Sequence, residues 1–290
     1  MRFIVKMVIC VFAYIAGVML TGIVMGALHL PSPTLPPGTT QQGMFASMIL
    51  GTLLLVLGLA PLAARLGRLR LQRWCALFLL IFVAIAVNTM IEASIFSNMV
   101  SIGVPWMCAH YILPCALLVS ALVFFFGNSK PTAGLPLLGP VQWAWRLLVA
   151  WLAFPVIYFV FGMCVAPFVT YAYHAGIAGL TIPPVTVIVR TQLLRSALFL
   201  GSSLPVLALW TGSRRGLFLT FGFAEAMMVG IHGLAQATWF PMVLRVAHSI
   251  EITFDSFAYV GVLVLLLTVA ASPAKDRSNN EVLQGATMNG

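Results

Sequence analysis

The chain has 290 residues, of which 61% are hydrophobic and only 7% carry a formal charge. An ordinary soluble domain is about a quarter charged, and even a large one leaves much of its surface to water. A water-soluble fold for the whole chain is therefore excluded, and the composition predicts a protein embedded in lipid. The formal net charge of +9 does not indicate nucleic-acid binding, because most Lys and Arg residues lie in short runs between apolar stretches.

Apolar windows of about 20 residues, enough to cross a bilayer as a helix, occur eight times. They lie near residues 5–28, 44–64, 74–98, 105–127, 143–168, 191–211, 216–238 and 246–271. Only a mild break at residues 97–103, closed by Pro105, separates the third window from the fourth, so six- and seven-span variants stay open. The sequence thus predicts an all-α, polytopic transmembrane helical bundle with about eight spans.

The first apolar run follows Arg2 and Lys6 and is too long for the apolar region of a secretion signal. It lacks a clear small-residue cleavage pattern, and we therefore expect a retained first span. This run contains the G-x-x-x-G pattern Gly22-Ile23-Val24-Met25-Gly26, which is typical of close helix packing in membranes.

Positive charges lie at the N-terminal end of the first span and after every second span. These cations are Arg2, Lys6, Arg65, Arg68, Arg70, Arg73, Lys130, Arg146, Arg214, Arg215, Lys275 and Arg277. The intervening connections hold only Arg190, Arg195 and Arg245. Because Lys and Arg are enriched in cytoplasmic loops, the pattern predicts a multi-pass protein of the cell (inner) membrane with both termini in the cytoplasm.

The spans divide into two sets of four. We expect a first transmembrane half at residues 1–128, a cytoplasmic linker at 129–142, a second half at 143–272 and a disordered cytoplasmic tail at 273–290. Leu50-Gly51-Thr52 resembles Leu200-Gly201-Ser202, and Arg65 matches Arg215 at the same offset of 150 residues. This similarity favours a four-plus-four tandem repeat, although apolar sequence of low complexity also aligns with itself by chance.

Four acidic residues fall inside predicted spans, where each charge costs about 2.5–3.5 kcal/mol at the bilayer centre. They are Glu92, Glu225, Glu251 and Asp255. In the eighth span, helical spacing places His248, Glu251 and Asp255 on one polar stripe, with Arg245 at its outer end. Residues as costly as these are expected to face the bundle interior.

Other polar groups are predicted at a similar depth, toward the outer leaflet. The candidate substrate- or proton-binding residues are Glu92, His110, Glu225, His232, His248, Glu251 and Asp255, and the candidate gate or ion-pair partners are Arg190, Arg195 and Arg245. Glu225 and His232 are seven residues apart and are therefore predicted to share one helix face. We interpret this convergence as a polar cavity open to the extracytoplasmic side, and a structural network of acid–arginine pairs is the alternative.

These residues favour a small-solute transporter or permease, because buried carboxylates and histidines suit proton coupling. One alternative is a membrane-embedded metal-dependent hydrolase, since His248 and Glu251 have a spacing found among metal ligands. The other is a non-catalytic accessory or sensor subunit. No catalytic residue and no cofactor are predicted, and the presence of a metal stays open. The lipid bilayer is the expected partner, while the substrate and the oligomeric state are not determined by the sequence.

Overall fold

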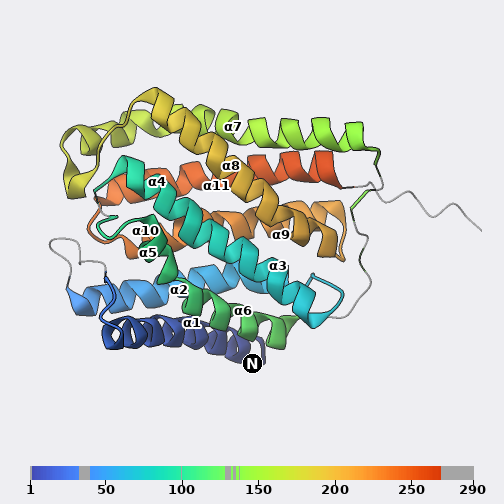
Figure 1. The fold of residues 1–290 in the computed structure, drawn as a ribbon, viewed down its shortest axis with the longest axis horizontal. Coiled ribbons are helices and arrows are strands. Elements are labelled where there is room, and N and C mark those ends of the chain that lie inside the picture. The colour runs from blue at the N-terminus through green and yellow to red at the C-terminus, as the bar shows by residue number, and fades with distance from the viewer. Residues whose placement is uncertain are drawn as a thin grey trace, which may run out of the picture.

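A computed structural model describes residues 2–32, 40–98, 100–127, 132, 135–136 and 138–268 of the chain. It contains eight helical stretches that are long and apolar enough to cross a membrane (Figure 1), which confirms the predicted number of spans and the polytopic helical bundle. The spans are α1 (Arg2–Ala27), α2 (Gln41–Ala63), α3 (Arg70–Phe82) with η1 (Val83–Asn88) and α4 (Thr89–Phe96), α5 (Val104–Ala109) with α6 (Ile112–Phe126), α7 (Pro140–His174), α8 (Val185–Leu209), α9 (Arg214–Ala226) with η3 (Met227–Ile231) and α10 (His232–Gln236), and α11 (Met242–Leu267).

The third and fourth spans are separate, because α4 ends at Phe96 and α5 begins at Val104. In the connection between α7 and α8, which contains η2 (Ile177–Gly179), Leu180 forms an isolated β-bridge with Ser97. The expected linker at 129–142 lies partly, and the expected tail at 273–290 wholly, outside the described residues.

The sixth span begins earlier than the sequence indicates. The sequence predicts this span at residues 191–211, with Arg190 and Arg195 near its outer end. In the structure, α8 begins at Val185 and places Arg195 ten residues inside the helix. A hydropathy window stops at charged residues because it treats each one as exposed to lipid. Arg195 is tolerated here because it is only 3% exposed and is paired with Glu92.

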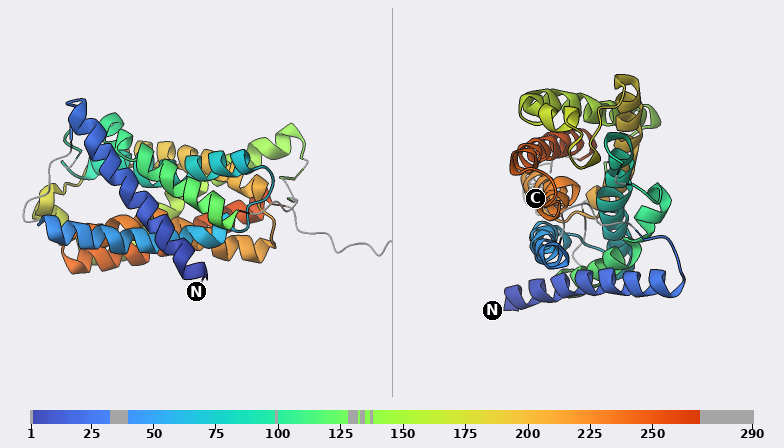
Figure 2. Two further views of the ribbon diagram at one scale, coloured as in Figure 1. Left: turned by 90° about the horizontal axis from the view of Figure 1, so that it is seen from below. Right: turned by 90° about the vertical axis from the view of Figure 1, so that its left-hand side faces the viewer.

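The helices form two rows, with α1 crossing one edge (Figure 2). One row contains α7, α11, α9 with α10, and α2, and the other contains α8, α3 with α4, and α5 with α6. The largest hydrophobic cluster of buried residues draws side chains from both rows and from α1. Both α1 and α11 have their chain-terminal ends at the same end of the bundle, here called the terminal end, and the opposite end is called the distal end (Figure 1).

The two sets of four spans pack alike. In the first set α1 packs against α6, and in the second α7 packs against α11. Across the two sets, α3 packs against α8 while α2 packs against α9. The starts of α2, α3 and η1 each precede those of α8, α9 and η3 by 144 residues. This interval differs from the 150-residue offset that matches Arg65 with Arg215 in the sequence. The isolated β-bridge between Leu66 and Trp210 spans the same interval.

Basic side chains near the terminal end bond to the last carbonyl groups of neighbouring helices. Lys6 donates to the carbonyl of Phe125 at 2.9 Å, and Arg146 donates to the carbonyl of Leu266 at 2.6 Å. These cations satisfy carbonyls that have no partner within their own helix and complement the negative end of the helix dipole. The two bonds join equivalent helix pairs of the two sets.

Two spans are interrupted by π-helical turns, η1 and η3, and these turns pack against each other. A π-turn adds about one residue to a helical turn and therefore changes which residues share a face beyond it. Such turns occur often at functional sites.

The close approach of α1 to a neighbour occurs at Gly17, which the sequence analysis did not single out. A Cβ atom on Gly17 would lie 2.5 Å from the Cα of Pro114 in α6. The predicted close-packing glycines, Gly22 and Gly26, instead face space with nothing within 4 Å of a Cβ. Their pattern therefore does not mark a packing contact within the described chain.

Candidate functional site

Three helices bring ionisable side chains together in the distal half of the bundle. Glu92 of α4 pairs with Arg195 of α8, with 2.6 Å between Oε1 and Nη1. The Arg195 guanidinium also donates to the side-chain oxygen of Gln192 at 2.9 Å and lies near the rings of Phe154 and Phe199. These contacts hold an arginine within the apolar bundle, where an unpaired charge would be costly.

The helix α11 contributes the remaining ionisable groups. His248 Nδ1 and Glu251 Oε2 are 2.5 Å apart, and the Nε2 atom of His248 lies 3.3 Å from the hydroxyl of Tyr173 in α7. The predicted polar stripe thus lies between α7 and the other helices of the site. Glu251 is 6% exposed, and a Cβ on Gly162 of α7 would lie 3.3 Å from its second carboxylate oxygen.

Asp255, one turn further along α11, belongs to the same group. It interacts electrostatically with Glu251, Glu92 and Arg195, and its Oδ1 atom is buried without a hydrogen-bond partner. The ionisable cluster is defined here as Glu92, Arg195, His248, Glu251 and Asp255. It contains three carboxyl groups and one guanidinium, so it has an excess of negative charge whenever the carboxyl groups are ionised and His248 is neutral.

Three further polar residues lie next to members of this cluster along their helices, on the side toward the middle of the bundle, and are here called the polar strip. Asn88 lies one turn before Glu92, Ser196 follows Arg195, and Tyr259 lies one turn after Asp255. The amide atoms of Asn88, which is fully buried, have no hydrogen-bond partner, and neither does the Nε2 atom of Gln192. Buried polar groups without partners are rare, so this strip is a place where water or a polar solute has donors and acceptors available.

Glu225 approaches the strip from α9. Its side chain is 4% exposed and interacts electrostatically with Tyr259, whose hydroxyl lies near Ser196. Glu225 therefore faces α11 at mid-bundle depth, close to the strip but apart from the ionisable cluster.

His232 lies elsewhere, contrary to the expectation that it shares a face with Glu225. It is buried against α1, where its Nε2 atom is 3.3 Å from the Tyr14 hydroxyl, and its ring nitrogens also contact the Gln236 amide. The reason is η3, which lies between the two residues and rotates the helix beyond it by about one residue. The seven-residue spacing assumed an uninterrupted α-helix.

His110 also lies outside the cluster. Its Nδ1 atom bonds with the carbonyl of Trp106 at 2.7 Å, while its Nε2 atom is buried without a partner. It lies at the junction of α5 and α6, where the local turn rather than the acids of α11 determines its contacts.

Only one of the three candidate arginines forms an ion pair within the described residues. Arg190 is exposed, and Arg245 donates to the carbonyls of Leu234 and Ala235 at 2.8 and 2.9 Å. Arg245 therefore caps the end of α10 rather than closing the cluster, because those carbonyls lie near the helix end and need external donors.

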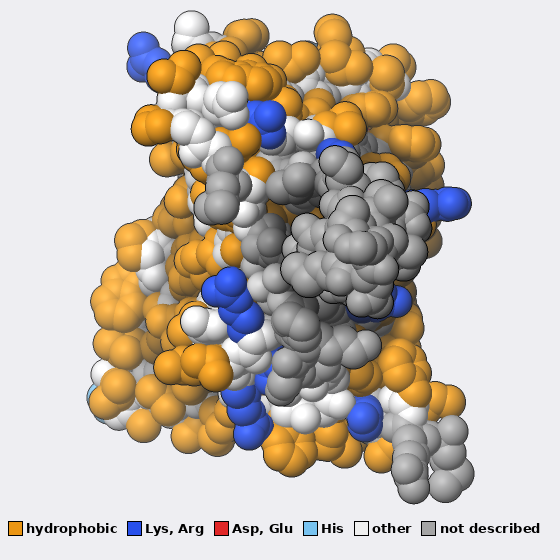
Figure 3. Space-filling model, turned by 90° about the vertical axis from the view of Figure 1, so that its right-hand side faces the viewer, with side chains coloured by type: hydrophobic (Ala, Val, Ile, Leu, Met, Phe, Trp, Pro, Cys, Tyr) orange, Lys and Arg blue, Asp and Glu red, His pale blue; other side chains and the backbone are white. Residues whose placement is uncertain are grey.

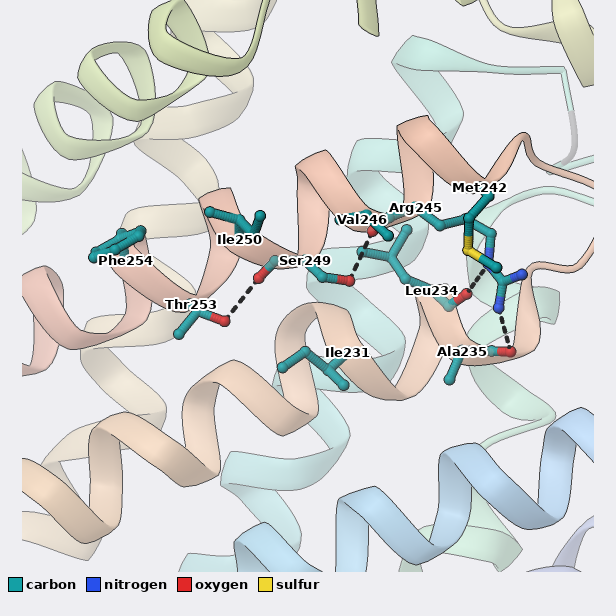
Figure 4. Close-up of a pocket in the computed structure, with 10 residues that line it drawn as sticks. All are labelled: Ile231, Leu234, Ala235, Met242, Arg245, Val246, Ser249, Ile250, Thr253 and Phe254. Atoms are coloured by element: carbon teal, nitrogen blue, oxygen red, sulfur yellow. Dashed lines mark hydrogen bonds between the residues drawn. The ribbon is translucent and has the colours of Figure 1, made fainter. Parts of the chain in front are cut away.

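Arg245 borders a groove of about 380 Å³ between α11 and the η3–α10 segment (Figure 4). Its walls are mostly apolar, and Ser249 and Thr253 donate back to carbonyls of their own helix. Neither Glu251 nor Asp255 lines it. The groove is thus distinct from the ionisable cluster.

Sequence reasoning missed the partners that orient the cluster. Tyr173 and Tyr158 of α7 and Gln192 of α8 all surround it, and Tyr158 interacts electrostatically with Glu92, Arg195 and Glu251. Tyr173, near a span end, resembles part of an interfacial belt. Tyr158 within an apolar span and Gln192 in an apolar helix have no distinctive spacing. Among the described residues, no three His, Cys, Asp or Glu side chains come together in a way that could hold a metal ion.

Comparisons with protein-family models, curated proteins and solved structures find no match to this chain.

Proposed function

We propose that this multi-pass membrane protein is a proton-coupled transporter of a small polar solute, with Glu251 and Asp255 as its proton- or substrate-binding carboxyl groups. The observation that carries the proposal is the ionisable cluster, where three carboxyl groups from two helices gather around one arginine inside an apolar bundle. Ionisable residues at membrane depth are costly and usually mark ion or substrate pathways.

The charge balance of the cluster favours binding of a cation or proton. Arg195 is engaged by Glu92, so Glu251 and Asp255 share only His248 as a further positive group. A structural ion network would be expected to match acids with arginines, yet Arg190 and Arg245 contact none of these carboxyl groups within the described chain. A proton or a cationic group of a solute would neutralise the excess negative charge.

The arrangement of the two sets of spans adds a second line of support. We infer that they are tandem repeats related by an axis along the membrane normal, since the starts of their second and third spans are 144 residues apart and their interhelical packing corresponds. In transporters built from repeats, binding sites lie at the repeat interface, where helices are interrupted in corresponding positions. Here η1 and η3 are such a pair, and Asn88 of the polar strip is the last residue of η1.

The positive-inside pattern assigns the terminal end to the cytoplasm, so the cluster would open toward the outside. Transport then requires the polar strip through Asn88 and Tyr259 to become accessible from the other side. In such a change, leucines of the large hydrophobic cluster such as Leu66 and Leu263 would have to separate.

The test is solute-driven proton movement in proteoliposomes that contain a pH-sensitive dye. Small organic cations, amino acids and organic anions are added outside, one class at a time. The wild-type protein should change the internal pH with at least one class, and Asp255→Asn should abolish the change. Ser249→Ala is the matched control, because Ser249 lies on the same helix but its hydroxyl bonds to its own helix. Wild-type-like proton movement in Asp255→Asn would contradict the proposal.

A second measurement does not require the solute. The variants are made in a chain whose five native cysteines are replaced. Asp255→Cys should react with a membrane-impermeant thiol reagent added from outside. Phe254 is exposed on the outer surface of the bundle, where lipid is expected at this depth, so Phe254→Cys should not react. Equal lack of reaction at both positions would mean that no aqueous path reaches the cluster.

A further inference from the structure

At the terminal end of the bundle, far from the ionisable cluster, lies a pocket of about 650 Å³ whose described lining residues are mainly arginines. Its walls are formed by Arg68, Leu69, Arg70, Gln72 and Arg73, at the connection between α2 and the start of α3. Figure 3 shows this end of the molecule, where Lys and Arg side chains are visible and no Asp or Glu is seen among the coloured side chains.

Arg73 is the central side chain of this pocket. It is only 6% exposed, yet its Nε atom is buried without a hydrogen-bond partner, while one terminal nitrogen donates to the carbonyl of Arg68 at 3.1 Å. A guanidinium group has five N–H donors in a fixed plane, and leaving one of them buried and unused is costly. The unused donor of Arg73 therefore indicates a missing acceptor.

The start of α3 adds backbone donors at the same place. The helix begins at Arg70, and its N-cap residue, Leu69, has no side chain that accepts a hydrogen bond from the first turn. The first N–H groups of a helix have no acceptor within the helix, and the helix dipole favours an anion there. Many phosphate groups in proteins are bound at such a position.

The positive charges of the pocket are not neutralised by carboxyl groups within the described part of the chain. Arg68 bonds to the hydroxyl of Thr132, Arg70 lies over the ring of Phe124, and neither takes part in the salt bridges of the structure. Arg70 and Arg73 are close enough to repel each other electrostatically. Gathering like charges around a pocket is unfavourable unless an anion compensates them.

One residue that lines the pocket, Arg68, has an uncommon backbone conformation. Arg68 has a φ of 64°, in the left-handed region that is unfavourable for a non-glycine residue. The residue before it, Gly67, is tied to the carbonyl of Leu209. This conformation presents the carbonyl of Arg68 to Arg73 and so orients the buried guanidinium.

We propose that this pocket binds a phosphate group, held by the guanidinium groups of Arg73, Arg68 and Arg70 and by the first backbone N–H groups of α3. The planar donor fork of arginine matches the oxygens of phosphate, which accept charge-assisted hydrogen bonds. The group comes either from the headgroup of an anionic phospholipid or from free phosphate. Both have the same recognition chemistry, and the pocket lies where the third span begins, which is where a lipid headgroup would be expected.

The test uses the full-length protein in nanodiscs of phosphatidylcholine with or without phosphatidylglycerol, and in detergent with sodium phosphate or sodium chloride at equal ionic strength. Native mass spectrometry counts retained phosphatidylglycerol, and thermal unfolding measures stabilisation by inorganic phosphate. A retained phosphatidylglycerol molecule identifies the lipid as the source, and stabilisation by phosphate alone identifies the free ion.

The variants separate the pocket from general positive charge. Arg73→Gln should weaken binding roughly tenfold or more, because it removes a charge-assisted donor, and Arg68→Gln provides the same test at an exposed position if Arg73→Gln does not fold. Arg215→Gln, at the start of α9 and outside the pocket, should bind like the wild type. The proposal fails if the wild type prefers neither phosphatidylglycerol over phosphatidylcholine nor phosphate over chloride. It also fails if Arg215→Gln weakens binding as much as the pocket variants.

Discussion

For the ion pair between Glu92 and Arg195, we expect the loss of the arginine to lower the free energy of unfolding more than the loss of the glutamate. Removing one member of a fully buried pair costs about 3–5 kcal/mol, because the other charge stays buried. Arg195→Gln should approach this range, since it leaves Glu92, Glu251 and Asp255 facing one another without the arginine. Glu92→Gln should cost only about 2 kcal/mol, because the Glu92 side chain is 32% exposed and the two other carboxyl groups remain near Arg195.

The measurement is the free energy of unfolding of both single variants and the double variant, obtained from loss of helical circular dichroism in mixed micelles of detergent and SDS. The double variant should be less destabilised than the sum of the two single variants by about 1–2 kcal/mol, since the loss of one partner makes the other dispensable. Equal costs for the two single changes, or simple additivity, would refute the electrostatic reasoning.

Two further predictions concern packing and orientation. Gly17→Ala should destabilise the bundle by about 1–3 kcal/mol, because the added Cβ meets the backbone of Pro114, whereas Gly22→Ala should have almost no effect on thermal unfolding. Equal thermal stability of the two variants would contradict the close contact of α1 with α6. Tyr173→Phe should cost about 0.5–1.5 kcal/mol in unfolding free energy, because it removes the hydroxyl that contacts His248. It should also lower proton movement in proteoliposomes without abolishing it, and wild-type behaviour in both assays would show that this contact is unimportant.

The spans were predictable because each one depends only on the apolar residues of its own segment. Each segment needs enough consecutive apolar residues to cross the lipid, and the mild break before Pro105 is sufficient to end α4 at Phe96 and begin α5 at Val104. The polar stripe of α11 was predictable for a similar reason. His248, Glu251 and Asp255 lie on one uninterrupted helix, so ordinary α-helical spacing places them correctly.

The contacts between helices were not predictable in the same way. The position of Arg195 inside α8 depends on Glu92, which is more than one hundred residues away and pairs with it only after the helices have packed. His232 and Glu225 lie on different faces because η3 stands between them. A π-turn holds about one more residue than an α-helical turn, and nothing clear in the amino-acid sequence indicates it. Tyr173 could be recognised only from its contact with His248.

The proposed repeat relation predicts a counterpart of the contact between Glu92 and Arg195 elsewhere in the described bundle. At the 144-residue interval, Glu92 in the first set corresponds to Gln236 in the second, and Arg195 in the second set corresponds to Gly51 in the first. These two residues also meet, because a Cβ on Gly51 would lie 2.9 Å from the Cγ of Gln236. The interhelical contact is thus present in both places while its chemistry differs. One copy holds a buried ion pair, and the other holds a glycine against a neutral amide, which packs without the electrostatic cost of buried charge. A contact that served only to hold the helices together could be neutral in both places. The presence of buried charge at one of them supports a role for the ionisable cluster beyond packing.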